Sequence, residues 1–351
     1  MHPPTRVGLI GCGFFAQNHL HAWRDLVPEG AELVAVCDTD PAKAQAAARA
    51  FGVRGVYTNA AHMFATENLG LVDIVTRMET HGALVGLAIA NKVPTIVQKP
   101  FAPTYAGCVA MVEAAHKARV FLAVHENFRF QTPMQKVAQA IASGVIGPPS
   151  WARLAWRTGF DVFATQPYFY DEERLAILDV GIHVLDLARV LMGEVRHLSC
   201  ETQRRNPRVR AEDTATMLLR HVSGAVSLVE VTYEARTLPD HFPETTLTIE
   251  GPRGAIIVPP GLVMHVTSDG ATTTYDIGAP LLPWTSKPWH VAQESVVKTC
   301  AHLLAAVRAG READVSGADN LKTFALVEAA YAAAAANQAV APMVWQPPTQ
   351  G

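Results

Sequence analysis

The sequence predicts an α/β protein with two domains: a parallel sheet covered by helices on both faces, then an α/β domain with a large open, mainly antiparallel or mixed sheet. Two observations predict this class. Short β-branched runs alternate with helical segments in the first third, and after about His125 strand-like runs follow one another across turns. A chain of 351 residues is long enough for two domains. We place them at residues 1–125 and 126–351.

The first domain is expected to alternate strands with helices. Asp40 followed by Pro41 is a favoured start for a helix, because the Asp side chain can accept a backbone N–H and proline suits the first turn. A helix also follows the first strand as far as about Leu26. The expected strands are Arg6–Ile10, Leu33–Cys37, Gly55–Tyr57, Val72–Thr76, Thr95–Val97 and Val120–Val124, and the other helices are Pro41–Phe51, Ala60–Ala65, His81–Asn91 and Tyr105–Arg119.

The second domain is expected to hold most of its strands in succession, because turn signals such as Ser223-Gly224 and Asp269-Gly270 separate alternating runs. The expected strands are Trp151–Arg157, Thr214–His221, Ala225–Thr232, Thr245–Glu250, Ala255–Val258, Leu262–Thr267 and Thr272–Ile277. The expected helices are Met134–Ser143, Leu175–Met192, Val291–Ala309 and Asn320–Ala336.

Composition narrows the function classes. A net charge of −3 implies no nucleic-acid partner and no basic membrane surface. The five cysteines never form a CxxC pair, and the fourteen histidines show no ligand spacing, so we expect a reducing compartment and no metal site. Only Met1 to Thr5 precede the first expected strand, Arg6–Ile10, and no stretch reaches membrane-spanning length. We therefore expect a cytoplasmic protein.

A glycine-rich turn follows the first expected strand. Gly11-Cys12-Gly13-Phe14-Phe15-Ala16 fits the G-x-G-x-x-G/A pattern of a dinucleotide-binding Rossmann domain. Gly11 permits the tight turn, Gly13 lets the backbone approach a pyrophosphate, and a small residue at 16 lets helix and strand pack closely. The helix N-terminus supplies N–H groups for the phosphates. A glycine turn without a ligand is the alternative reading.

Asp38 ends the second expected strand and predicts which dinucleotide binds. A carboxylate there can accept hydrogen bonds from the adenine-ribose hydroxyls and would repel a 2′-phosphate. Asp40 adds to that repulsion. We therefore expect NAD in preference to NADP, unless Lys43 or Arg6 reaches the ribose.

Two further features suggest chemistry. Lys99-Pro100 follows a strand at the sheet edge where ligands bind, although a lysine in an ordinary loop is the alternative. Asp179, His183 and Asp186 recur at i, i+4 and i+7 on a helix that is otherwise apolar, so they are expected to share one face. Burying such groups is costly unless they are paired with one another or take part in the function. Both a functional site and a buried histidine with structural Asp partners therefore stay open.

The chain resembles the Gfo/Idh/MocA oxidoreductases (glucose-fructose oxidoreductase, inositol dehydrogenase and rhizopine-catabolism proteins). The resemblance covers nearly the whole sequence. Its motifs, in chain order, are Gly11–Ala16, Asp38, Thr80-His81, Lys99-Pro100, Asn127-Phe128-Arg129-Phe130, Asp179-x-Gly181-x-His183-x-x-Asp186 and Ser316-Gly317-Ala318-Asp319.

The resemblance implies an NAD-dependent oxidoreductase that acts on an alcohol carbon of a sugar, inositol, sugar acid or related polyol, with Lys99, Asp179 and His183 as its catalytic residues. His183 would exchange the hydroxyl proton, Lys99 would stabilise the reacting oxygen, and Asp179 would orient His183 or bind a neighbouring hydroxyl. The ammonium group and the imidazole would meet at the nicotinamide ring. The resemblance also implies a homodimer or homotetramer assembled through the C-terminal sheet.

Further contacts are expected from the family likeness and from the residue types that suit sugars and carboxylates. The cofactor set is Gly11, Gly13, Phe14, Phe15, Ala16, Asp38, Thr76, His81, Gln98, Lys99 and Asn127, and the substrate set is Lys99, Arg129, Arg157, Tyr168, Asp179, His183 and Trp289.

The sequence departs from the family pattern at two places. Gln98 stands where the family usually has Glu before Lys-Pro, and Arg77 lies in a segment where relatives often have Pro. Two other functions are considered. One is an NAD-dependent glycosidase that oxidises a sugar carbon transiently, and the other is a dinucleotide-sensing regulator without catalysis. Because Lys99 and His183 are both present, the regulator ranks last.

Overall fold

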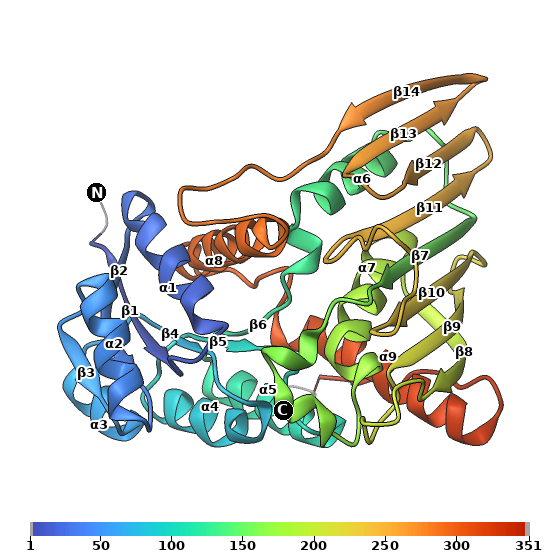
Figure 1. Cartoon of the computed structure of the whole chain (residues 1–351). Coiled ribbons are helices and arrows are strands. Elements are labelled where there is room, and N and C mark those ends of the chain that lie inside the picture. The colour runs from blue at the N-terminus through green and yellow to red at the C-terminus, as the bar shows by residue number, and fades with distance from the viewer. Residues whose placement is uncertain (1–2, 348–351) are drawn as a thin grey trace. The chain divides into compact units, whose positions relative to one another are not determined.

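The computed structural model describes residues 3–347 and divides the chain into two compact units (Figure 1). Within the described residues, the first comprises 3–127, 295–321 and 345–347, and the second comprises 128–294 and 322–344. The ranges differ from the predicted 1–125 and 126–351, because residues 295–321 return to the first unit. Val124 N–H donates to Val315 O at 2.9 Å, which ties that segment to the edge of the first sheet.

The first unit contains a six-stranded parallel sheet in the order β3-β2-β1-β4-β5-β6, which is the dinucleotide-binding order. The direction of strand succession reverses between β1 and β4, and this reversal marks the expected ligand position. The strands are β1 (Thr5–Ile10), β2 (Ala31–Cys37), β3 (Gly55–Tyr57), β4 (Leu71–Ile74), β5 (Thr95–Gln98) and β6 (Leu122–His125). The helices are α1 (Ala16–Asp25), α2 (Pro41–Phe51), α3 (Ala60–Thr66), α4 (His81–Ala90) and α5 (Tyr105–Ala118).

Local sequence explains these elements. Strands β4, β5 and β6 are buried along their whole length, as expected of central strands covered on both faces. Asp40 caps α2 as predicted, because its Oδ1 accepts the Ala42 N–H at 2.9 Å. The parallel sheet and the Rossmann domain are thus confirmed.

The second unit contains an eight-stranded mixed sheet in the order β14-β13-β12-β11-β7-β10-β9-β8. All its pairings are antiparallel except that of β7 with β10. The strands are β7 (Trp151–Arg157), β8 (Val195–Gln203), β9 (Thr214–His221), β10 (Val226–Thr232), β11 (Thr245–Gly251), β12 (Gly254–Val258), β13 (Val263–Ser268) and β14 (Ala271–Asp276). The longer helices after β6 are α6 (Thr132–Ala142), α7 (Ile182–Met192), α8 (His290–Ala309) and α9 (Gly317–Ala336).

Two features differ from the sequence expectation. Strand β8 was not predicted, because most of its residues are exposed at the sheet edge and it lacks a regular apolar alternation. The helix expected over Leu175–Met192 contains a π-helical segment, Ile177–Gly181, before α7 begins. Across the described residues, 3–347, no helix is both long and apolar enough to cross a membrane.

Candidate functional site

The glycine loop after β1 has the geometry of a dinucleotide cradle. Gly11 has φ = +94°, and a Cβ there would lie 2.3 Å from the carbonyl oxygen of Val75, so no larger residue fits. A Cβ on Gly13 would meet no atom within 4 Å, so its backbone faces open space. Helix α1 starts at Ala16 without a side-chain cap among the described residues, and the positive end of its dipole lies next to the glycine loop, where phosphate groups are favoured.

Asp38 lies beside this loop. Its Oδ2 accepts the Cys12 N–H at 2.7 Å and its Oδ1 accepts the Asp40 N–H at 2.8 Å. An ionised carboxylate has about four acceptor positions, so these two bonds orient Asp38 and leave capacity for ribose hydroxyls. The residues present therefore fit NAD.

The loop that carries Lys99 is held by hydrogen bonds to Gln98 and to His81. The Lys99-Pro100 peptide is cis, and the Lys99 N–H donates to Oε1 of Gln98 at 2.7 Å. His81 is buried, and its ring nitrogens lie 3.1 Å from the carbonyl oxygens of Thr76 and Phe101. His81 thus joins the segment after β4 to the Lys99 loop.

Other predicted cofactor residues vary in exposure. Phe14 is 61% exposed, whereas Asn127 is buried and donates from Nδ2 to Ser295 Oγ at 2.7 Å. Arg77 forms an exposed ion pair with Glu79, as a loop charge would. The contacts of these side chains with a cofactor stay predictions.

In the second unit, Asp179 and His183 have separate supports. Tyr233 donates a very short hydrogen bond to Asp179 Oδ2. Burial and the nearby Asp179 raise the pKa of Tyr233 well above its usual value, so its hydroxyl stays a donor. The His183 ring stacks on Phe128, with centroids 3.9 Å apart and planes 2° apart, which fixes the imidazole plane.

Asp186 has different partners from the other two residues of its predicted set. It is fully buried and accepts two hydrogen bonds from Arg129, from Nε at 2.7 Å and from Nη2, and one from Thr323 Oγ1 at 2.8 Å. Arg189 lies 3.6 Å from the same carboxylate. A π-helical turn holds more residues than an α-helical one, so the i, i+4, i+7 spacing across residues 179–186 does not define one α-helical face.

The structure gives the other predicted substrate residues partners of their own. Arg129 is engaged with Asp186, and Arg157 donates to Glu230 Oε2 at 3.1 Å. Tyr168 is 42% exposed, and Trp289 packs edge-on against Phe242 at 4.7 Å. Each stays a prediction as a substrate contact.

The second unit contains a cavity of about 300 Å³ that the sequence did not predict. Tyr233, the partner of Asp179, forms part of its wall. No spacing or motif marks these residues, because they come from separate loops and strand ends. The lining is Gly159, Phe160, Asp161, Phe163, Arg205, Asn206, Pro207, Arg208, Tyr233, Glu234 and Arg236.

His125, at the end of β6, predicts a pH effect on stability. Burial, with a contribution from His19, lowers its pKa from 6.5 to about 3. The unfolded chain therefore binds a proton there that the folded chain does not, and stability falls as pH drops below 6.5. We expect a loss of about 2 kcal/mol between pH 6.5 and 5 from this residue. Buried His81 and His221, whose pKa values are also lowered, act in the same direction.

The melting temperature measured between pH 7 and 5 checks this. His125→Phe retains a ring and should flatten the profile, whereas His197→Gln on the exposed side of β8 should leave the slope unchanged. An equal slope in His125→Phe and the unmodified chain would contradict the assignment.

Comparison with known proteins defines the class. The family model for the oxidoreductase family with an NAD-binding Rossmann fold matches residues 5–126, and that of the GFO/IDH/MocA C-terminal domain matches residues 134–257. With the glycine loop and Asp38, these matches define an NAD-binding oxidoreductase. The chain belongs to the Gfo/Idh/MocA family, as the resemblance predicted.

The similar proteins include sugar and polyol dehydrogenases. A D-apiose dehydrogenase of Rhizobium rhizogenes is 47% identical over 332 residues, covering 95% of this chain and 96% of the relative. An inositol 2-dehydrogenase of Acidothermus cellulolyticus is 32% identical over 65% of this chain and 66% of the relative. A similar fold is found in a crystal structure of an oxidoreductase from Agrobacterium radiobacter in complex with NAD+, L-tartaric acid and magnesium, whose sequence is 46% identical to this chain. It has a TM-score of 0.94 and covers 96% of this chain and 98% of that chain.

Proposed function

We propose that the chain is a D-apiose dehydrogenase that uses NAD. One observation carries the proposal: 47% identity to a D-apiose dehydrogenase over 95% of the chain and 96% of that relative. A second D-apiose dehydrogenase, from Paraburkholderia graminis, is 46% identical over 93% of the chain. The inositol dehydrogenases are less similar and match a shorter part.

The chemistry follows from the residues described above. His183, held flat against Phe128, takes the proton from the substrate hydroxyl as a general base. Lys99 donates a hydrogen bond to the same oxygen and stabilises its developing negative charge. Asp179, held by Tyr233, orients His183 or accepts from a neighbouring hydroxyl. NAD, when bound, supplies the hydride acceptor.

A panel of D-apiose, myo-inositol, levoglucosan and L-tartrate, each with NAD and with NADP, tests the function through NADH or NADPH absorbance. We expect the highest kcat/KM with D-apiose. NAD should exceed NADP about tenfold or more, because Asp38 repels a 2′-phosphate. A higher kcat/KM with myo-inositol than with D-apiose would overturn the assignment of D-apiose as the substrate. Release of an aglycone from a glycoside without net NADH would favour the glycosidase, and NAD binding without turnover would favour the regulator.

The outer face of the second sheet supports an oligomer. Leu218, Leu228 and Ile257 lie in one cross-strand row with Arg153 and Thr248, and Leu218 is 52% exposed. We propose that this face forms a homodimer or homotetramer interface, because exposed apolar rows mark interaction surfaces. A monomeric mass in light scattering would contradict this. A cytoplasmic location stays a prediction, consistent with five buried cysteines that form no disulfide.

A further inference from the structure

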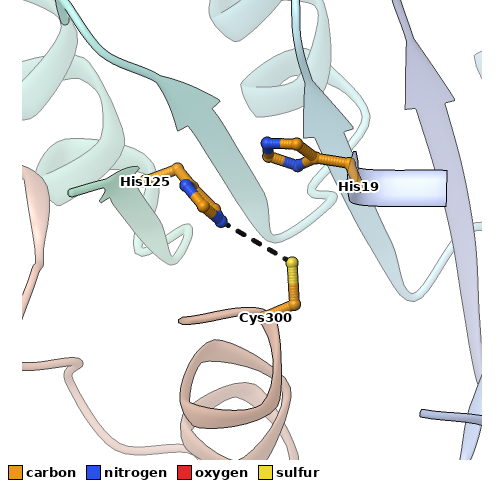
Figure 2. A group of neighbouring side chains, drawn as sticks. All are labelled: His19, His125 and Cys300. Carbon is orange, nitrogen blue, oxygen red and sulfur yellow. Dashed lines mark hydrogen bonds between the residues drawn. The ribbon is translucent and has the colours of Figure 1, made fainter. Parts of the chain in front are cut away.

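A buried cluster in the first unit has no part in the chemistry described so far. His19 on α1, His125 at the end of β6 and Cys300 on α8 place ligand-type atoms within 4.8 Å of one another (Figure 2). Cys300 Sγ lies 3.7 Å from His125 Nε2. Two imidazoles and a sulfur are donors that zinc or copper accepts, so the cluster has two readings: a metal site or a hydrogen-bond network.

The contacts of His19 favour the network. Its Nδ1 lies 2.8 Å from Asp73 Oδ2 and its Nε2 lies 3.0 Å from Gln98 Nε2, so both ring nitrogens are engaged. A metal ion would have to displace one of these partners. Burial raises the pKa of the Cys300 thiol well above its usual value, so without a metal ion the sulfur keeps its proton.

The hydrogen bonds fix the tautomer of His19. Gln98 Oε1 accepts the Lys99 N–H at 2.7 Å, so the NH2 group of Gln98 must face His19 Nε2. Nε2 is then an acceptor, and the single ring proton lies on Nδ1, which donates to Asp73. The same Asp73 oxygen also accepts from Trp23 Nε1 at 2.7 Å. The chain of bonds runs from buried Asp73 through His19 and Gln98 to the main chain of Lys99.

We propose that Asp73 and His19 are positioning residues that set the orientation of the Gln98 amide and thereby hold the Lys99 main chain in place. The catalytic part of this inference rests on the proposed role of Lys99. It also gives a reason for Gln98, the departure from the family pattern. An ionised glutamate has no proton to give to His19 Nε2, so it would favour a His19 that is protonated at both nitrogens, between two carboxylates.

Histidine nitrogen NMR of the full chain, labelled with nitrogen-15 histidine, tests the network without relying on activity. We expect His19 to be neutral with its proton on Nδ1 near pH 7, and to become doubly protonated in Gln98→Glu. Its signals are assigned by their loss in His19→Gln, with His197→Gln as the matched control. A proton on Nε2 in the unmodified chain would overturn the proposal, because Nε2 could then not accept from the Gln98 amide.

Two His19 variants separate positioning from simple filling of the core. Glutamine can place an oxygen near the Nε2 position and accept from Gln98, whereas asparagine can place an amide nitrogen near Nδ1 and donate only to Asp73. We expect His19→Asn to lower kcat about tenfold or more and His19→Gln to lower it less, with the KM for NAD changed less than about twofold in both. The reverse order would mean that His19 serves only Asp73 and would overturn the proposal.

Metal analysis of the purified chain tests whether the cluster is instead a metal site, and we expect no bound zinc. One equivalent of zinc in the purified chain, lost in Cys300→Ser, would also overturn the network. If Lys99→Ala itself kept normal turnover, the role of Lys99 would fail while the NMR experiment still reported the bonds of His19. The two failures are therefore distinguishable.

Discussion

Replacing Lys99 or His183 with alanine should lower turnover about a hundredfold or more while leaving NAD binding intact. His183 is expected to carry the hydroxyl proton and Lys99 to stabilise the reacting oxygen, and groups of these kinds contribute about 10² or more to rate. Neither substitution changes the cradle formed by Gly11, Gly13 and Asp38, so the dissociation constant for NAD should stay within a few fold of that of the unmodified chain. Steady-state kinetics with D-apiose and titration with NAD measure the two quantities.

Matched controls keep the comparison specific. Lys117→Ala on the exposed side of α5 and His197→Ala on β8 remove the same side-chain types away from the predicted site. Both should retain near-normal kcat. Near-normal kcat in Lys99→Ala and His183→Ala as well would show that neither group takes part in the reaction.

Asp186→Asn should destabilise the second unit by about 3–5 kcal/mol, the usual effect of removing one partner from a buried ion pair. Asp186 is fully buried and Arg129 is 11% exposed at its side chain, so the substitution removes a carboxylate charge that faces a largely buried guanidinium. Arg189 also lies near the carboxylate, although it is paired with Glu194 at 3.0 Å. Urea or thermal unfolding of the variant measures the loss.

A double variant shows whether the effect comes from breaking this buried ion pair. Arg129→Met with Asp186→Leu removes both charges and keeps much of the volume, so it should lose less stability than Asp186→Asn alone. Asp171→Asn, on an exposed turn, should change stability by less than about 0.5 kcal/mol. A loss below about 1 kcal/mol in Asp186→Asn would contradict the buried ion pair.

The first unit could be predicted closely because its signals are local. The glycine loop, the Asp40-Pro41 helix start and the fully apolar strands each need only a few neighbouring residues. The strand Gly55–Tyr57 and the helix Pro41–Phe51 have the predicted bounds. The sequence also predicted Gly11, but not its full reason, which is the closeness of the Val75 carbonyl in the segment directly after β4.

Features that depend on distant partners could not be predicted. The role of Tyr233 could not be predicted, because it depends on a hydrogen bond to Asp179, which lies 54 positions away in the sequence. The spacing of Asp179, His183 and Asp186 assumed an ideal α-helix, and the π-helical segment changed that geometry. The sequence grouped Asp186 with Asp179 and His183 because the spacing could not reveal its ion-pair partner. That partner, Arg129, lies on a separate segment of the chain.

The most direct test is the turnover of the double variant Lys99→Ala/His183→Ala beside that of the two single variants. If the ammonium and the imidazole serve one chemical step on one oxygen, the losses are not independent, and the double variant should be about as slow as the slower single variant. Losses that multiply would instead mean that the two groups act separately, and this would contradict the shared site on which the proposed mechanism depends.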